Sequence, residues 1–282
     1  MKIDTRKILL LLGGAIVLLY MILYFVWYQY QSTVEFRFFD DSAEWLGMDK
    51  VGHFITAFYE SLFIFYIVSF LKNKFTDDFS ANNFSAIIYG WGGFVVQFPI
   101  EILDGFSSGY GFSWYDILAN FLGSAWFVWQ MLVWNSIKIF PKISFFSSPY
   151  SAIRPSMLGS NFLEHFIKDY NGKTAWLTFS PNNVLGFRVF PKWFLIAIGY
   201  GIDGVLGGDD NVWTDENGEL KDYSHIERRW QVYLSIDIDF EELPIKNYYF
   251  NKALKIFTLY KFPLPSLEFL QNTQVLFHYV YF

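Results

Sequence analysis

The sequence predicts a membrane protein of the α+β class. We expect a transmembrane or amphipathic four-helix bundle, followed by an antiparallel β-rich region with a short helix. The first observation is composition: 53% of the residues are hydrophobic and only 17% are charged, whereas a soluble domain usually carries about 25% charged residues. The second is a change of pattern, from long apolar stretches in the first half to alternating residues in the second.

Composition also excludes several classes of protein. The chain of 282 residues contains 34 Phe, 19 Tyr and 11 Trp, which is too much apolar surface for a disordered protein. It contains no Cys, which excludes disulfides and Cys-based zinc or redox sites. The net charge is −6 and no basic block occurs, so we expect no nucleic-acid partner.

Four apolar stretches in the first half are each long enough to cross a bilayer as a helix, which takes about 20 residues. The first follows Lys2, Arg6 and Lys7. It ends in aromatic residues without a small-residue cleavage site, which favours an uncleaved signal anchor over a cleaved signal peptide. Pro99 is expected to kink the third near its end. The stretches are Ile8–Tyr28, Val51–Leu71, Phe84–Leu103 and Trp114–Trp134.

Basic residues indicate the orientation of these stretches in an inner membrane. They precede the first stretch, separate the second from the third at Lys72 and Lys74, and follow the fourth at Lys138 and Lys142. Because basic connections stay in the cytoplasm, the acidic connections are expected to face outward. This orientation would place residues 145–282 in the cytoplasm. In an outer membrane the argument does not apply, so the sequence leaves the choice of membrane open.

We divide the chain into an N-terminal anchor over residues 1–30, a helical domain over 43–140 and a β-rich domain over 145–282. Period-two alternation, typical of strands, is most regular in Arg229–Phe240 and Phe194–Asp203. Two further strands are expected at Lys173–Ser180 and Thr273–Phe282, and an amphipathic helix is expected at Asn247–Lys261.

The strands have two interpretations. The twelve-residue alternation and the aromatic Phe282 at the end of the sequence are typical of strands of outer-membrane barrels. Only about four strands are recognisable, however, and eight is the usual minimum for a single-chain barrel. A small sheet packed against helices is therefore the alternative.

Polar residues within the apolar stretches recur at helical spacing. Ionisable groups in membrane segments are costly, so they indicate a functional site by default. Each one also has an ordinary role: Ser113 and Asp116 suit a helix N-terminus, and His53 beside a carboxylate suits helix association. We expect the set to converge on one membrane side. The candidate residues are Asp49, His53, Glu60, Glu101, Asp104, Ser113, Asp116 and Asn120.

One His with several carboxylates supports a limited range of chemistry. Such a set can bind a divalent cation, for which the candidate ligands are His53, Glu101, Asp104 and Asp116. It can also move a proton or bind the amine of a lipid headgroup. Nucleophile-elbow, zinc-protease and Walker motifs are absent from the sequence.

Three blocks in order carry a family resemblance. They are Asp49-Lys50-Val51-Gly52-His53-Phe54, Glu101-Ile102-Leu103-Asp104-Gly105 and the Ser113-Trp114-Tyr115-Asp116-Ile117-Leu118-Ala119-Asn120 segment with Gly123. Over residues 43–135 the chain resembles the YfiM-like family of predicted periplasmic lipoproteins, in the longer form of the Bacteroidota, and more distantly VanZ-like membrane proteins. The resemblance implies a bacterial envelope protein whose motif residues face the periplasm, without an established reaction. Lacking Cys, the chain has no lipobox, so we expect the first apolar stretch to anchor it.

Three functions follow as hypotheses. The first is an envelope protein that binds a lipid headgroup, a lipid-linked precursor or a cation at the His/carboxylate cluster. The second is a structural or accessory subunit of an outer-membrane complex. The third is a membrane-embedded lipid hydrolase or transferase with His53 as base. We expect membrane lipids, and in the second case other envelope proteins, as partners.

Overall fold

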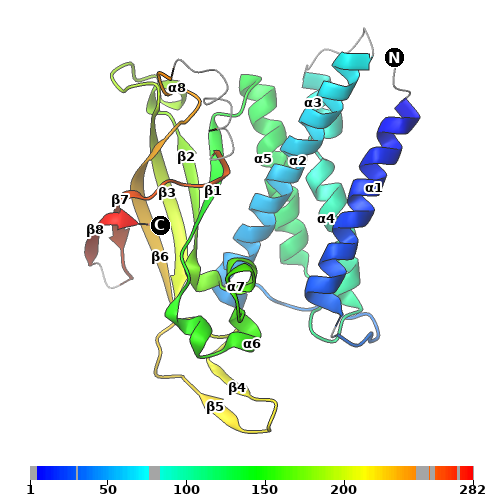
Figure 1. Ribbon diagram of the computed structural model, residues 1–282, viewed down its shortest axis with the longest axis vertical. Helices are drawn as coiled ribbons and strands as arrows, with labels where there is room; N and C mark the ends of the chain where they lie inside the picture. The colour runs from blue at the N-terminus through cyan, green and yellow to red at the C-terminus, as the bar shows by residue number, and fades with distance from the viewer. Residues whose placement is uncertain are drawn as a thin grey trace. The chain divides into compact units, whose positions relative to one another are not determined.

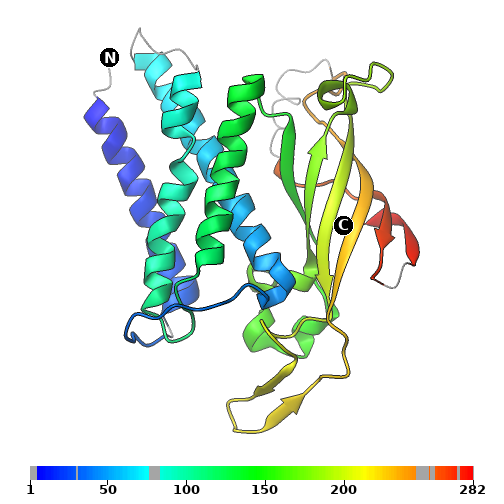
Figure 2. The same cartoon turned by 180° about the vertical axis from the view of Figure 1, so that it is seen from behind.

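The computed structural model describes residues 5–29, 31–75, 83–245, 254, 258–271 and 274–281. It has an α+β fold with helices in the N-terminal half and an antiparallel sheet in the C-terminal part (Figures 1 and 2). The chain separates into two compact units. The first comprises residues 1–42 and 50–137, and the second comprises residues 43–49 and 138–282.

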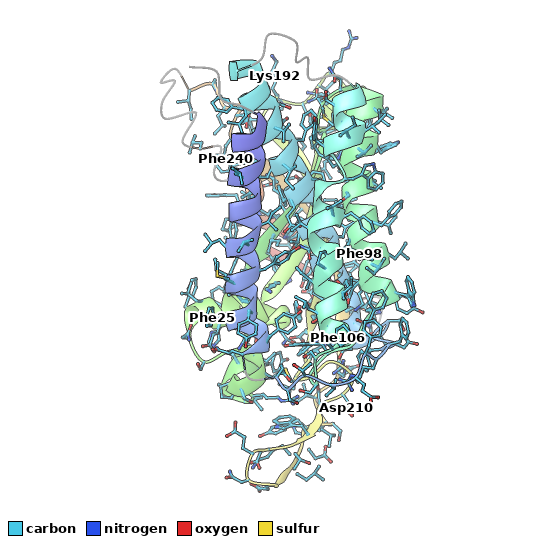
Figure 3. All side chains as sticks on the ribbon, turned by 90° about the vertical axis from the view of Figure 1, so that its right-hand side faces the viewer. Phe25, Phe98, Phe106, Lys192, Asp210 and Phe240 are labelled. Carbon is cyan, nitrogen blue, oxygen red and sulfur yellow. The ribbon has the colours of Figure 1, made fainter. Side chains whose placement is uncertain are left out.

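The first unit is a helical bundle. Its long helices run side by side in Figures 1 and 2, and Figure 3 shows many side chains projecting from them, Phe98 of α4 among those labelled. A π-helical turn, η1, extends α1. The elements are α1 (Thr5–Leu23), η1 (Tyr24–Tyr28), α2 (Met48–Phe75), α3 (Asn83–Tyr89), α4 (Gly92–Gly105) and α5 (Trp114–Trp134).

Three helical stretches of the described chain are long and apolar enough to cross a membrane, against the four that the sequence predicts. They are Glu44–Leu71, Ser85–Gly105 and Trp114–Trp134. The N-terminal helix α1 forms where the first span was predicted. Within it, Gly13–Ile22 is an apolar stretch that is shorter than the other three. Among the described residues, the prediction of four spans is therefore corrected to three candidates.

The third predicted span is divided in two at Gly90–Trp91, while Pro99 lies inside α4. The first amides of α4 are satisfied by neighbouring helices. Gly93 N donates to Ser61 Oγ of α2 at 3.0 Å, and Phe94 N donates to Ser124 Oγ of α5 at 2.8 Å. The two hydroxyls also bond each other at 2.9 Å. Serines can thus support a helix break where water is absent.

Glycines allow α2 to approach both neighbours closely. A Cβ on Gly93 would lie 1.9 Å from Ala57 O, and a Cβ on Gly123 would lie 2.2 Å from Phe54 O. Small residues at such contacts are typical of helix packing in membranes. Beside them is an aromatic core that includes Phe58, Phe65 and Phe127.

Gly123→Ala is expected to lower the free energy of unfolding by about 1–3 kcal/mol, because the added methyl group meets backbone that cannot move aside. Chemical denaturation in detergent micelles measures the change. The matched control is Gly52→Ala on α2, where a Cβ meets nothing within 4 Å, so helix propensity should leave stability equal or higher. Equal stability of the two variants would contradict the close contact.

The second unit contains a six-stranded antiparallel sheet in the order β1-β2-β3-β6-β7-β8, and a separate hairpin of β4 and β5. Strands β2, β3 and β6 run side by side, and the hairpin projects beyond them (Figure 2). The strands are β1 (Ile139–Phe145), β2 (Lys173–Phe179), β3 (Phe194–Asp203), β4 (Val212–Thr214), β5 (Leu220–Asp222), β6 (Arg229–Ile238), β7 (Leu264–Phe269) and β8 (Val275–Tyr281).

Short helical segments connect these strands. They are η3 (Pro149–Ala152), α6 (Pro155–Leu158), α7 (Phe162–Lys168), η4 (Tyr170–Gly172) and α8 (Pro181–Val184). A further 3₁₀ turn, η2 (Glu44–Gly47), precedes α2 and belongs to this second unit.

The four predicted strands are present as β2, β3, β6 and β8, with ends shifted by at most two residues. Two strands of the sheet were not predicted. In β1, Lys142 resembles the basic flank of a helix but is buried. In β7, Pro265 indicates a break, and the structure accommodates it with a register shift between Leu264 and Ser266. The helix predicted over 247–261 lies mostly outside the described residues.

Candidate functional site

A glycine-rich turn positions the ends of α4 and α5. The segment of the chain before α2 pairs with this turn, since Arg37 N donates to Gly105 O and Phe112 N donates to Arg37 O, both at 2.9 Å. The Arg37 guanidinium also donates to Tyr110 O. Gly105 is required here because a Cβ would lie 2.3 Å from the ring of Phe36. The turn therefore fixes where α5 begins.

Ser113 caps α5 as the sequence predicts. Its Oγ accepts hydrogen bonds from Tyr115 N at 3.1 Å and Asp116 N at 3.0 Å. The hydroxyl proton is given to Asp41 Oδ1 at 2.5 Å. Ser113 is fully buried, and Asp41 is 4% exposed. The cap thereby joins the loop before α2 to the first turn of α5.

Lys50 connects two carboxylates. Its Nζ lies 2.5 Å from Asp41 Oδ2 and 2.8 Å from Asp116 Oδ1, and all three side chains are at most 15% exposed. A shielded ion pair of this kind is costly to break, because one charge would stay buried alone. At the neighbouring Asp40, hydrogen bonds from Ser42 lower the pKa of the carboxyl.

His53 connects the same cluster to α4. Its Nδ1 lies 3.2 Å from Asn120 Oδ1 and 3.4 Å from Glu101 Oε1, and its Nε2 lies 3.8 Å from Asp116 Oδ1. Asn120 Nδ2 donates to Glu101 Oε1 at 3.1 Å. Glu101 and Asn120 are fully buried, whereas the His53 side chain is 20% exposed. His53 is thus the accessible member of an otherwise enclosed set.

Two other predicted residues make separate contacts. Glu60, two helical turns beyond His53, accepts a hydrogen bond from Gln97 Nε2 at 2.9 Å. Asp104 accepts one from the Tyr28 hydroxyl at 2.5 Å, which ties η1 to the end of α4. Neither contact involves the ion pair around Lys50.

Asp49 lies one helical turn before His53, on the same face of α2. Within the second unit, its Oδ1 accepts a hydrogen bond from the Tyr170 hydroxyl at 2.9 Å. The residues just before it are strained, since Trp45 and Leu46 have φ values of 51° and 50°. Such left-handed backbone in bulky residues persists only where surrounding contacts hold it.

Those contacts come from the sheet unit. Trp45 N donates to Gly208 O at 2.8 Å, the Tyr200 hydroxyl donates to Leu46 O, and the rings of Trp45 and Tyr170 lie 5.2 Å apart. A strained turn held by three contacts therefore precedes the first residue of α2.

The structure brings His53, Glu101, Asp116 and Asn120 together, with Ser113 as the cap. It adds two residues that sequence reasoning did not select, Asp41 and Lys50. Asp41 lies outside any helix, so helical spacing gave no signal for it. Lys50 lies at the start of a predicted span, where a lysine ordinarily occupies the membrane interface, so its position gave no reason to select it.

The nitrogen and oxygen atoms that these side chains could offer as metal ligands suit a hard or borderline cation. His53 and Asp116 offer ligand atoms within 4.8 Å of each other, and Glu101 offers a carboxylate oxygen 3.4 Å from the same ring. Imidazole with carboxylates suits zinc or manganese, whereas carboxylates alone suit magnesium or calcium. The predicted ligand Asp104 is paired with Tyr28 instead.

Fold and site together define a helical domain built around buried carboxylates, an Asn and a His. Residues 36–131 match the model of the family described as "Predicted periplasmic lipoprotein (DUF2279)". The YfiM-like resemblance is confirmed by this match, whereas the likeness to VanZ-like proteins gains no support from it. No curated protein matches the chain, and no solved structure does so either.

Ser113→Ala should lower the free energy of unfolding by about 1–2 kcal/mol, because a helix cap is lost and Asp41 loses a donor. Chemical denaturation in detergent micelles measures this. Ser136→Ala serves as the control, since the Ser136 hydroxyl donates only to the nearby Trp134 O in an exposed position. If both variants unfold at the same denaturant concentration, the cap has no such role.

Proposed function

We propose that the protein is a bacterial envelope protein whose membrane-embedded helical unit binds a cationic group at the His53 cluster. The group is a divalent cation or the amine of a lipid headgroup or lipid-linked precursor. The observation that carries the proposal is the gathering of buried carboxylates at one place. Asp41, Glu101 and Asp116 lie around the Lys50 ammonium and the His53 ring.

The gathering matters because several carboxylates held close together away from water are costly. Hydrogen bonds from Ser113 and Asn120 relieve part of this cost. A bound cation would relieve more of it, and His53 can supply a neutral nitrogen ligand. The enclosed carboxylates would then be held ready for an incoming positive charge.

Membrane embedding is supported by the three candidate spans and by apolar side chains on their surfaces. Phe63 on α2, Val95 on α4 and Leu118 on α5 are each more than half exposed. The pattern of basic residues would place the start of α2 and the end of α4 on the outer side. The cluster would therefore be reached from the periplasm.

His53→Ala should weaken Mn²⁺ binding to the purified full-length protein in detergent. Removing even an outer-shell partner of a metal ligand costs about 10–100-fold in affinity, so loss of a ligand is expected to cost at least as much. Isothermal titration calorimetry gives the affinities. His225→Ala is the matched control, because His225 lies exposed between β5 and β6. Equal affinity of the two variants would reject the site.

A competition experiment separates the two sources of positive charge. Short-chain phosphatidylethanolamine, added at fixed Mn²⁺, should displace the ion if the cluster accepts a headgroup amine, whereas short-chain phosphatidylglycerol should not. Displacement by neither lipid would assign the site to metal ions alone. Absence of Mn²⁺ binding, together with absence of phosphatidylethanolamine binding, would overturn the proposal.

Lys50→Gln is expected to tighten Mn²⁺ binding severalfold, because the ammonium no longer competes for Asp41 and Asp116. The same titration measures it. Gln keeps a hydrogen-bond donor near both carboxylates, which limits the loss of stability. Weaker binding by a folded Lys50→Gln protein would mean that the lysine supports the ligand instead of competing with it.

A further inference from the structure

The six-stranded sheet encloses charged and polar side chains, beside aromatic ones, on its inner face and exposes apolar side chains on its outer face. On the inner face, Lys142 Nζ lies 2.7 Å from Asp237 Oδ2, and these side chains are 2% and 0% exposed. Beside them, Glu268 is 4% exposed and accepts a hydrogen bond from Gln231. Tyr233 is 1% exposed and packs against Trp176.

The outer face is apolar and open. In β6 the alternation is complete, since Leu234 and Ile236 are exposed while Ser235 and Asp237 are buried. On the neighbouring strand β3, Ile198 is exposed on the outer face, whereas the buried residues Leu195 and Ala197 are on the inner face. The outer residues that are more than a third exposed are Leu177, Ile198, Trp230, Leu234, Ile236, Phe269, Val275, Phe277 and Tyr279, none of which carries a charge.

The sheet is curled over its polar side. The Tyr281 hydroxyl of β8, the last strand in the sheet, lies 3.0 Å from Thr174 Oγ1 of β2. At the other edge, Tyr260 forms a parallel bridge with Ile143 of β1, and Lys261 N donates to Ile143 O at 3.0 Å. The inner polar groups are thereby enclosed, and the apolar residues are on the convex side.

This distribution of polar and apolar side chains between the two faces is the reverse of the one that water favours. Water drives apolar side chains inward and leaves charges outside. A slip of one residue in strand register would exchange the two faces of the sheet. The observed register keeps Lys142 and Asp237 inside, although the hydrophobic effect in water would favour the opposite face. An apolar solvent around the sheet favours the observed arrangement, as in membrane-spanning strands.

Strand length and aromatic positions agree with a bilayer. Strands β3 and β6 are each 10 residues long, and a tilted strand needs about 9–11 residues to cross the hydrocarbon. Trp230 lies near one end of the β3–β6 pair, where Ile202 is its partner. At the other end are Phe194, stacked on Phe190 at 5.0 Å, and the neighbouring Trp193. Such aromatic belts mark membrane interfaces.

We propose that the outer face of this sheet contacts the acyl chains of a lipid bilayer. A protein partner would be expected to meet about one hydrogen-bonding group per 100–200 Å², yet the exposed residues Ile198, Leu234, Ile236 and Phe277 of this face have no hydrogen-bonding side-chain group. A fluid hydrocarbon covers a convex apolar surface without such groups. The proposal is independent of the His53 cluster, which lies in the other unit.

The absence of Cys from the chain allows a direct test with single cysteines. Full-length Leu234→Cys and Phe277→Cys proteins are labelled with an environment-sensitive fluorophore and reconstituted in phosphatidylethanolamine and phosphatidylglycerol vesicles. Part of the lipid is replaced by phosphatidylcholine brominated in its acyl chains. Leu220→Cys in β5 is the matched control, because Leu220 is a 65% exposed leucine on the separate hairpin.

Labels at residues 234 and 277 should be quenched severalfold more by the brominated lipid than the label at residue 220, and severalfold less by aqueous iodide. Iodide quenching equal to that at residue 220 would overturn the proposal in favour of a water-exposed face. Protection from iodide without bromine quenching would also overturn it, and would indicate a second copy or a protein partner.

Discussion

The helical unit depends on the shared ion pair in which Lys50 bridges Asp41 and Asp116. Asp41 also accepts the hydroxyl proton of Ser113, whose oxygen caps α5. A loop, the start of α2 and the start of α5 are thereby fixed to one another through buried charge. Removing Lys50 would leave both carboxylates enclosed without this ammonium, and such charges are costly. The positions of His53 and Asn120, one turn further along α2 and α5, follow from this arrangement.

Buried polar groups also find partners elsewhere in each of the two units. Ser61 and Ser124 accept the free amides at the start of α4, so that the bundle tolerates an interrupted helix. In the sheet, Lys142 pairs with Asp237, and the Tyr233 ring lies beneath that of Tyr281 at 4.4 Å. Each unit therefore encloses paired polar groups beside an apolar core and also presents many apolar side chains on its surface.

Sequence patterns predicted the helices and strands in which apolar residues recur at a regular spacing. The start and end of α5 were correct, because Ser113 is a recognisable cap and Asn135 supplies the left-handed residue that ends the helix. Strand β3 was correct to the residue. Strand β7 was missed, since Pro265 reads as a break and only tertiary pairing reveals the bulge that absorbs it. Asp41 was missed because a loop residue has no period.

The sequence by itself determined the membrane-like composition, the helical spacing of His53, Glu101, Asp116 and Asn120, and the family whose model residues 36–131 match. It also determined that β6 has one polar and one apolar face. Tertiary structure alone decided which face is buried, because alternation is the same in water and in lipid while the surrounding contacts differ. It likewise decided that Lys50 lies among the carboxylates, since a charge finds its partner through space and not along the chain.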